Sequence, residues 1–283
     1  MGYDVSSVPL ASEAPAVRRK PLLKHRKLMR RLSPYAVIVG FFLIWELICR
    51  VFGIEEFVLP APTAIMQAGW QFREPIAAEA WHTLFTTLIG FAIAVVVGLL
   101  AGTIIGSSSL IYEAFYPVLI GLNSVPKVAV VPILVLWFGI GTVPAIITAF
   151  LISFFPILVN VATGIATVEP ELKDVLRALG AKQYQVIMKV GLPRSMPYFF
   201  ASLKIAISVA FVGSILAETV GSDKGIGQLM LIASSRFQVP LAFAGLVVTG
   251  AMGIGMYVVA ALVEQRMTRW ATRSFDTSAF AGG

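Results

Sequence analysis

The stretch LRALGAKQYQVIMKVGLP, residues 176–193, is a polar interruption in a chain built mostly of apolar runs. The overlapping stretch EPELKDVLRALG, residues 169–180, places apolar residues at i, i+3, i+4 and i+7, which gives a helix one apolar stripe. The members of this stripe are Leu172, Val175, Leu176 and Leu179. Pro170 suits the first turn of a helix, and Gly180 suits its end. The pattern predicts an amphipathic helix, a bend at Gly180 and a second short helix, closed by Pro193 and Pro197.

The amphipathic helix has two interpretations. Its apolar stripe could lie flat on a lipid surface, or it could fill a socket on a soluble partner protein. The periodicity of the residues alone leaves both open.

The composition around this segment is that of a membrane protein. Of the 283 residues 58% are hydrophobic and 13% are charged, and the mean hydropathy is +0.86. Soluble domains carry about 25% charged residues, and roughly 20 apolar residues span a bilayer. We therefore expect an all-α integral membrane protein with about six transmembrane helices.

The expected spans divide the chain into a transmembrane domain, 34–265, between an N-terminal tail, 1–33, and a C-terminal tail, 266–283. They run over about 34–52, 83–106, 112–139, 143–164, 198–218 and 241–263. Prolines and a lysine in NSVPKVAVVP, residues 123–132, interrupt the third span. FVLPAPTAI, 57–65, should be extended, and 219–240 should form a glycine-rich loop.

Basic residues set the expected orientation. Arginines and lysines crowd 18–31, recur over 173–194 and return at 266–273, while the loop after the first span is acidic. Because positive charge favours the cytoplasmic side, both tails and the 169–193 segment should be cytoplasmic. The same rule explains the basic N-terminus better than binding to nucleic acid does.

Polar groups inside the expected spans are candidates for a solute path, because such groups are costly in lipid. They are Asn123, Lys127, Asn160, Ser208 and Glu218. Lys127 suits an anionic solute, but it can equally snorkel to an interface. Glu218 can instead anchor the following loop, whose GSDKGIG stretch, 221–227, is either a gate or a simple re-entrant turn. Gly98, Gly102 and Gly106 form a ladder that allows close helix packing within one subunit.

Several kinds of chemistry find no support in the sequence. The chain has no G-x-x-x-x-G-K-[ST] phosphate loop and no H-E-x-x-H motif, and it contains one cysteine and two histidines. We therefore expect no enzyme activity, no metal and no cofactor bound by this chain. A secondary transporter and a membrane scaffold are the rival classes, although no convincing internal repeat supports the former.

The 174–193 segment resembles the cytoplasmic loop of ATP-binding-cassette (ABC) importer permeases. That pattern is E-A-A, three residues, Gly, nine residues, Ile, one residue, then Leu-Pro. Here Gly180 is followed by nine residues and then Val190, Gly191, Leu192 and Pro193, while Asp174, Val175 and Leu176 stand at the E-A-A positions, both alanines being replaced by larger residues. VPKVAVVPILVLWFGIG, FFPILVNVATGI and AETVGSDKGIGQL resemble the nitrate/sulfonate/taurine class of these permeases.

The resemblance implies a multi-pass subunit of the type I importer kind in the bacterial inner membrane. Its implied partners are a second permease copy, two cytoplasmic ATPases that carry ATP and Mg, and an extracytoplasmic solute-binding protein. The implied solute is a small anion such as a sulfonate, taurine or nitrate, with a pyrimidine or vitamin precursor or an aromatic acid as the alternative. The implied ATPase-docking residues are Glu171, Leu172, Asp174, Val175, Leu176, Arg177, Ala178, Leu179, Gly180, Ala181, Leu192 and Pro193.

Overall fold

The computed structural model describes residues 22–268, and all of its regular elements in that range are helical. In chain order they are α1 (Leu22–Val51), α2 (Pro62–Gln71), α3 (Arg73–Gly106), α4 (Ser109–Ser124), the 3-10 turn η1 (Lys127–Val130), α5 (Val131–Phe138), α6 (Thr142–Ala166), α7 (Pro170–Ala178), α8 (Gln183–Val186), the π turn η2 (Ile187–Gly191), α9 (Leu192–Gly221), α10 (Ile226–Ser235) and α11 (Val239–Met267). The predicted N-terminal tail lies outside the described residues up to position 21 and within α1 after it. The predicted C-terminal tail lies outside them from residue 269.

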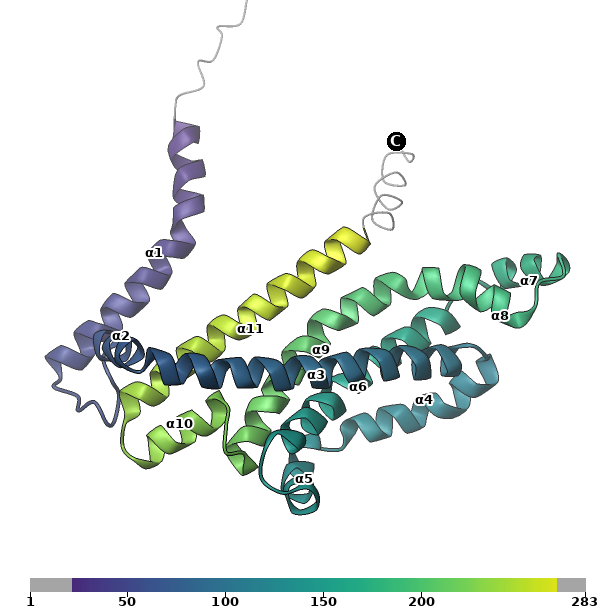
Figure 1. The fold of residues 1–283 in the computed structure, drawn as a ribbon. Coiled ribbons are helices and arrows are strands. Elements are labelled where there is room, and N and C mark those ends of the chain that lie inside the picture. Colours follow the sequence, from purple (N-terminus) through teal and green to yellow (C-terminus); the bar gives the residue numbers. More distant parts are fainter. Residues whose placement is uncertain (1–21, 269–283) are drawn as a thin grey trace, which may run out of the picture.

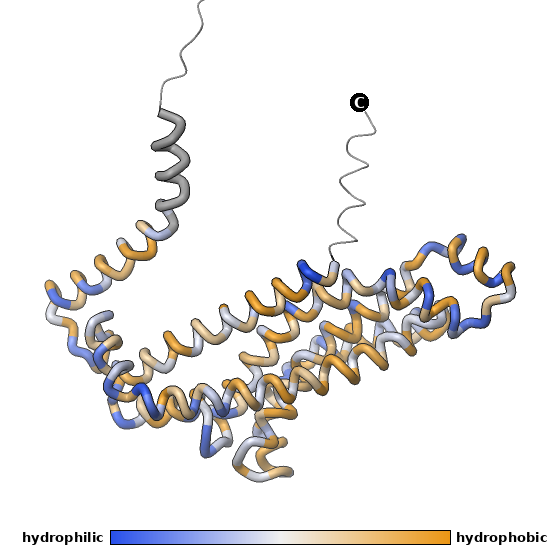
Figure 2. Tube along the Cα trace, turned by 45° about the horizontal axis from the view of Figure 1, so that its top comes forward, coloured by the Kyte–Doolittle hydropathy of each residue, from blue (hydrophilic) through white to orange (hydrophobic). Residues whose placement is uncertain are grey.

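Four helical segments are long and apolar enough to cross a membrane: 73–106, 142–166, 183–221 and 239–267. The bent pair formed by α4 and η1–α5 makes a fifth if its two arms are counted as one span. The expected count of about six requires α1 as well, whose second half covers the first predicted span. Figure 2 shows apolar residues along the middle of the long helices, with polar residues gathered toward the ends of the bundle.

Helices α3, α6 and α9 pack together as the centre of the bundle (Figure 1). The glycine ladder of α3 faces α6, and this agrees with the predicted close packing within one subunit. A Cβ atom added at Gly102 would lie 2.8 Å from the carbonyl oxygen of Leu158, and one added at Gly106 would lie 2.7 Å from that of Ala162. Only glycine lets the two backbones approach so closely, so the ladder is used inside one subunit.

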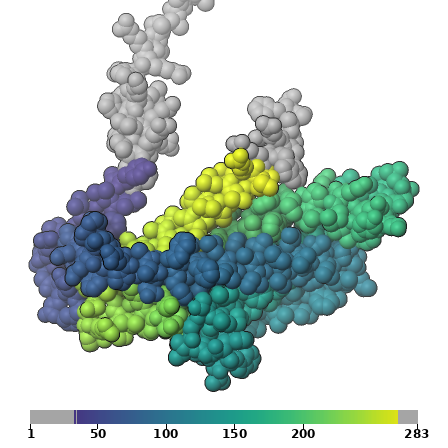
Figure 3. Space-filling model, viewed as in Figure 1, coloured from purple at the N-terminus to yellow at the C-terminus, as the bar shows by residue number. Residues whose placement is uncertain are grey.

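The third predicted span is broken, as its prolines and lysine indicated. Helix α4 ends at Ser124, and the η1–α5 arm begins at Lys127 with a bend of 70° between the two arms. Pro126 at the break cannot donate a backbone hydrogen bond. Gly139 and Gly141, at φ 79° and 140°, then turn the chain into α6. The tip of α5 projects from the side of the molecule (Figure 3).

The fifth predicted span is wrong in its start. Instead of ending at Pro193 and Pro197, the short helix α8 continues through η2 into α9, so that 183–221 is one apolar helical segment of 39 residues. Pro193 falls in the first turn of α9, where its missing N–H costs little, and the wider π turn precedes it. Pro197 is accommodated inside the helix, as membrane helices often allow.

Two predicted loops contain helices. The glycine-rich loop 219–240 holds α10, whose buried Ile226 and Ala233 join Ile76 of α3 in an apolar cluster. The prediction that 57–65 is extended holds only near Ala61: Val58 and Leu59 lie in a turn, where both N–H groups donate to the carbonyl of Glu55, and Pro62 begins α2. The proline at the first helical position explains the start of α2. The apolar residues that α10 buries explain why it forms a helix.

Helix α1 leaves the rest of the molecule at a steep angle (Figures 1 and 3). Contacts of its second half with the chain beyond it include the following two. Trp45 packs edge-on against Phe243 of α11, with 6.3 Å between the ring centres. The Glu46 carboxylate accepts a hydrogen bond from the backbone N–H of Thr63 at 3.0 Å. Glu46 thereby caps the start of α2, so α1 and α2 form one corner of the fold.

Candidate functional site

Helix α7 presents its apolar stripe to the outside of the chain. Val175 and Leu179 are 58% and 79% exposed, Leu172 is also exposed, and Leu176 is half-buried. The predicted helix over 169–180 is confirmed in α7, and its stripe is not covered by the described part of this chain. An uncovered stripe of this kind is typical of a surface that another molecule covers.

Gly180 ends α7 in the way the sequence predicted. Its φ is +82°, in the left-handed region that favours glycine. The N–H of Gly180 donates to the carbonyl of Arg177, and the N–H of Ala181 donates to that of Leu176, both at 2.9 Å. This Schellman-type end turns the chain sharply from α7 into α8.

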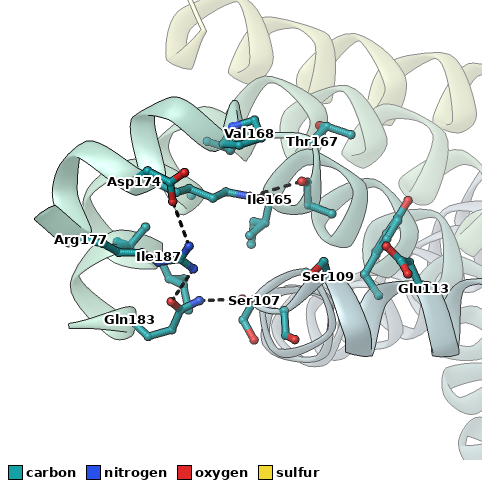
Figure 4. A pocket seen from close by; sticks show the side chains of 18 residues that line it. Ser107, Ser109, Glu113, Ile165, Thr167, Val168, Asp174, Arg177, Gln183 and Ile187 are labelled. Carbon is teal, nitrogen blue, oxygen red and sulfur yellow. Dashed lines mark hydrogen bonds and ion pairs between the residues drawn. The ribbon is translucent and has the colours of Figure 1, made fainter. Parts of the chain in front are cut away.

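A chain of polar contacts fixes α7 against the turn between α3 and α4 (Figure 4). Arg177 donates to the carboxylate of Asp174 and to the side-chain oxygen of Gln183, each at 3.2 Å. Gln183 in turn donates to the backbone carbonyl of Ser107 at 2.9 Å. Arg177 therefore orients the exposed side of α7, and Gln183 links Arg177 to the α3–α4 turn.

Lys173 holds the other side of α7 to the end of α6. Its ammonium group donates to the backbone carbonyls of Ile165 and Ala166, at 3.5 and 3.3 Å. These are among the last carbonyls of α6, which need partners outside their own helix. Burial, followed by repulsion from Arg177, lowers the pKa of Lys173, while Glu169 acts in the opposite direction.

A cavity of about 870 Å³ lies behind α7, between the α3–α4 turn, the end of α6 and α8 (Figure 4). Its lining combines serine hydroxyls and Glu113 with the apolar side chains of Ile165 and Ile187. Within residues 22–268 no group of three His, Cys, Asp or Glu side chains could hold a metal ion.

Most of the expected docking residues share this end of the molecule. Glu171, Leu172, Asp174, Val175, Leu176, Arg177 and Ala178 lie on α7, and Leu179, Gly180 and Ala181 follow it directly. Leu192 and Pro193 lie in the first turn of α9. The structure thus places ten of the expected residues in one short helix and its end, with two more beyond α8 and η2.

The candidate path residues do not form one cluster. Asn123 and Lys127 meet at the break between α4 and η1, where the Lys127 ammonium donates to the backbone carbonyl and side-chain oxygen of Asn123, at 2.6 and 2.8 Å. The same ammonium lies 4.9 Å from the ring centre of Phe155 in α6. A cation at a broken span is thus held by a local carbonyl, an amide and an aromatic face.

The other three candidates have different surroundings. Asn160 and Ser208 each donate to a carbonyl four residues earlier in their own helix, those of Pro156 and Lys204. Glu218 is fully buried between α3, α9 and α10. Its position matches the anchoring role that the sequence left open beside a role in the path.

Sequence reasoning missed the long-range partners of these groups. Lys204 of α9 forms an ion pair with Glu264 of α11, and Thr83 of α3 donates to Glu218 at 2.8 Å. Thr83 and Glu218 are 135 positions apart, and no local pattern relates them. Only the packing of the helices brings such pairs together.

Long apolar helices, a broken span with Lys127 at the break and an exposed amphipathic helix at one end are the features that the sequence led us to expect of a membrane permease. Residues 94–269 match the family described as binding-protein-dependent transport system inner membrane component, and the chain belongs to that family. It is therefore an integral membrane protein of the ABC transporter permease kind, as its resemblance implied.

The chain is similar over most of its length to permease proteins that are named for different solutes. It is 31% identical to a Bacillus subtilis permease protein named for aliphatic sulfonates transport, over 92% of this chain and 94% of the relative. It is also 31% identical to the riboflavin transport system permease protein of Chloroflexus aurantiacus, over 80% and 85%. A chain of the MetNI methionine ABC transporter shares the fold, with a TM-score of 0.60 and 19% identity, over 70% of this chain and 97% of that one.

Proposed function

We propose that this chain is the transmembrane subunit of an ABC importer and that a separate ATPase drives it through α7. The observation that carries the proposal is the exposed apolar stripe of α7 beside the oriented Arg177. A lipid surface could also take up such a stripe. The ATPase is favoured because α7 ends in the Gly180 turn that the permease pattern contains, and because family members are transport subunits.

The complete transporter that we propose has two copies of this chain, two ATPase subunits and an extracytoplasmic solute-binding protein. ATP and Mg belong to the ATPase, since the sequence contains no phosphate-binding loop of its own. The basic residues near both ends and around α7 support a bacterial inner membrane location with both termini and α7 in the cytoplasm.

The connection from α7 to the bundle supports alternating access as the mechanism. Closure of the ATPase pair would displace α7, and two direct contacts would pass the displacement on. Gln183 at the start of the 183–221 segment binds both Arg177 and the α3–α4 turn, and Lys173 binds the end of α6. Rocking of α3, α6 and α9 would then expose the path alternately to the two sides.

A small anion is the solute that we propose, with Lys127 as its principal contact. Lys127 is the cation at the exposed break of a span, where non-helical backbone has to face protein or water rather than lipid. The Bacillus subtilis relative is named for sulfonates, which are anions. The relative named for riboflavin supports the alternative of a vitamin or a pyrimidine precursor.

Recruitment of the ATPase tests the docking role. Membranes containing the tagged chain would be solubilised with the neighbouring ATPase co-expressed, and the ATPase retained with the chain would be quantified. Leu179→Asp should reduce retention at least ~10-fold, because it places a charge where a leucine worth ~2 kcal/mol is buried in the complex.

Leu110→Asp in α4 is the matched control, because Leu110 is equally exposed, at 77% against 79%, but lies off α7. It should retain the ATPase at the wild-type level. Equal retention by both variants would remove the docking role from α7 and place the ATPase contact elsewhere on the chain.

A further inference from the structure

The first three backbone N–H groups at the start of α10 are each bound by a side chain from another helix. Gly225 donates to the carboxylate of Glu79 in α3. Ile226 donates to the hydroxyl of Thr83 in α3 at 2.8 Å, and Gly227 donates to the carboxylate of Glu218 in α9 at 3.1 Å. A helix usually caps its start with a neighbouring residue, so a cap supplied by distant α3 and by the preceding helix α9 ties three elements together.

The cap is closed by a contact between its own members. The Thr83 hydroxyl donates to the same Glu218 oxygen that binds Gly227, at 2.8 Å. Thr83 and Glu218 are both fully buried, and a Cβ atom added at Gly225 would overlap the Glu218 carboxyl group. Pulling α10 away would leave the three N–H groups without these partners and would remove the Gly227 N–H from the buried Glu218 carboxylate, which is costly in an apolar surrounding.

Glu218 also lies near the far end of the helical segment that starts at Gln183, beside α7. We propose that Glu218, Glu79 and Thr83 are positioning residues that latch α10 to α3 and α9. The latch makes α10 move with the bundle, so that the glycine-rich stretch before it is a fixed turn and not an independent gate. This inference goes beyond the proposed function, because it concerns motion within the chain.

The test measures the distance between α10 and α3 with spin labels. Cys49 is the only cysteine, so Cys49→Ser gives a background for labels at Ile232→Cys on α10 and Trp81→Cys on α3. Labelled chain would be diluted with unlabelled chain in nanodiscs, so that each distance falls within one copy. The distance should stay within about 2 Å when the ATPase is trapped with ATP and vanadate.

Matched variants separate the latch from general packing. Thr83→Val removes the hydroxyl and should broaden the distance distribution or shift it by about 5 Å. Thr83→Ser should restore the wild-type distribution. Thr87→Val should leave it unchanged, because Thr87 is equally buried one turn along α3 and its hydroxyl has no hydrogen-bond partner within residues 22–268.

Two results would overturn the latch. One is a shift of about 5 Å in the wild-type chain on nucleotide trapping, which would make α10 a moving gate. The other is a Thr83→Val distribution that matches that of Thr87→Val. The variants can be compared in the chain alone, so the latch is decided even if no ATPase binds and the proposed function fails.

Discussion

At the scale of single residues, Gly180 combines a special backbone conformation with open space. Its φ is +82°, and in the part of the chain that the structure describes no atom beyond its chain neighbours lies within 4 Å of where a Cβ would be. Gly180→Ala should therefore act through the backbone alone, costing about 1 kcal/mol in the left-handed region and loosening the end of α7. Gly180→Asn should be milder, because asparagine tolerates that region.

The measurement is ATPase stimulation in the reconstituted complex. Gly121→Ala is the control, since Gly121 also has nothing within 4 Å but lies inside α4 without a positive φ. It should be neutral. Identical stimulation in Gly180→Ala and Gly121→Ala would show that the turn at Gly180 does not matter for coupling.

Lys127 carries the prediction about solute charge. Removing the charge with Lys127→Gln should lower uptake of an anionic solute by ~10- to 100-fold, the equivalent of one hydrogen bond to a charged group. Lys127→Arg should keep most of the uptake. Proteoliposome uptake of a sulfonate measures this. Unchanged uptake in Lys127→Gln would mean that Lys127 only donates hydrogen bonds to Asn123 at the break and does not contact the solute.

Single residues also show what the sequence could and could not predict. The bend at Gly180 and the break at Pro126 and Lys127 follow from local backbone chemistry, and both are present. The contacts of Glu218 with Thr83 and Gly227 depend on helix packing, which no local pattern encodes.

At the scale of elements, the contact between α3 and α6 depends on the glycine ladder. Gly102→Leu would force a side chain into space already held by Leu158 and Val161 of α6, where even a Cβ would lie 2.8 Å from existing atoms. We expect the free energy of unfolding to fall by ~1–3 kcal/mol or more, as overpacking usually causes. Thermal unfolding of the purified chain in detergent measures it.

Gly250→Leu in α11 is the control for the ladder, because nothing lies within 4 Å of a Cβ there. It should unfold at nearly the wild-type temperature. A Gly102→Leu variant that is as stable as Gly250→Leu would contradict the close α3–α6 packing.

The elements themselves were predictable from hydropathy, but their ends were not. Pro193 and Pro197 predicted an end to the short helix, yet the π turn and the first-turn position of Pro193 allow 183–221 to continue. Helix α10 was hidden because ten residues are too few to span a membrane and glycines surround them.

At the scale of the whole molecule, the sequence predicted a helical membrane protein with its polar helix at one end, and the structure agrees. It did not predict that α1 would stand apart from the bundle or that the 183–221 segment would join α7 to the region of α10 (Figure 1). Such arrangements arise from packing between distant helices rather than from local periodicity.

The central claim is that solute delivery on one side controls ATP hydrolysis on the other through this chain. The direct measurement is the ATPase rate of the chain reconstituted in liposomes with its neighbouring ATPase and binding protein, with sulfonates, nitrate, pyrimidine precursors and aromatic acids added one at a time. We expect one solute to raise the rate, only with the binding protein present, and Gly180→Arg to abolish the effect. A rate that is indifferent to every solute, or unchanged in Gly180→Arg, would contradict the account.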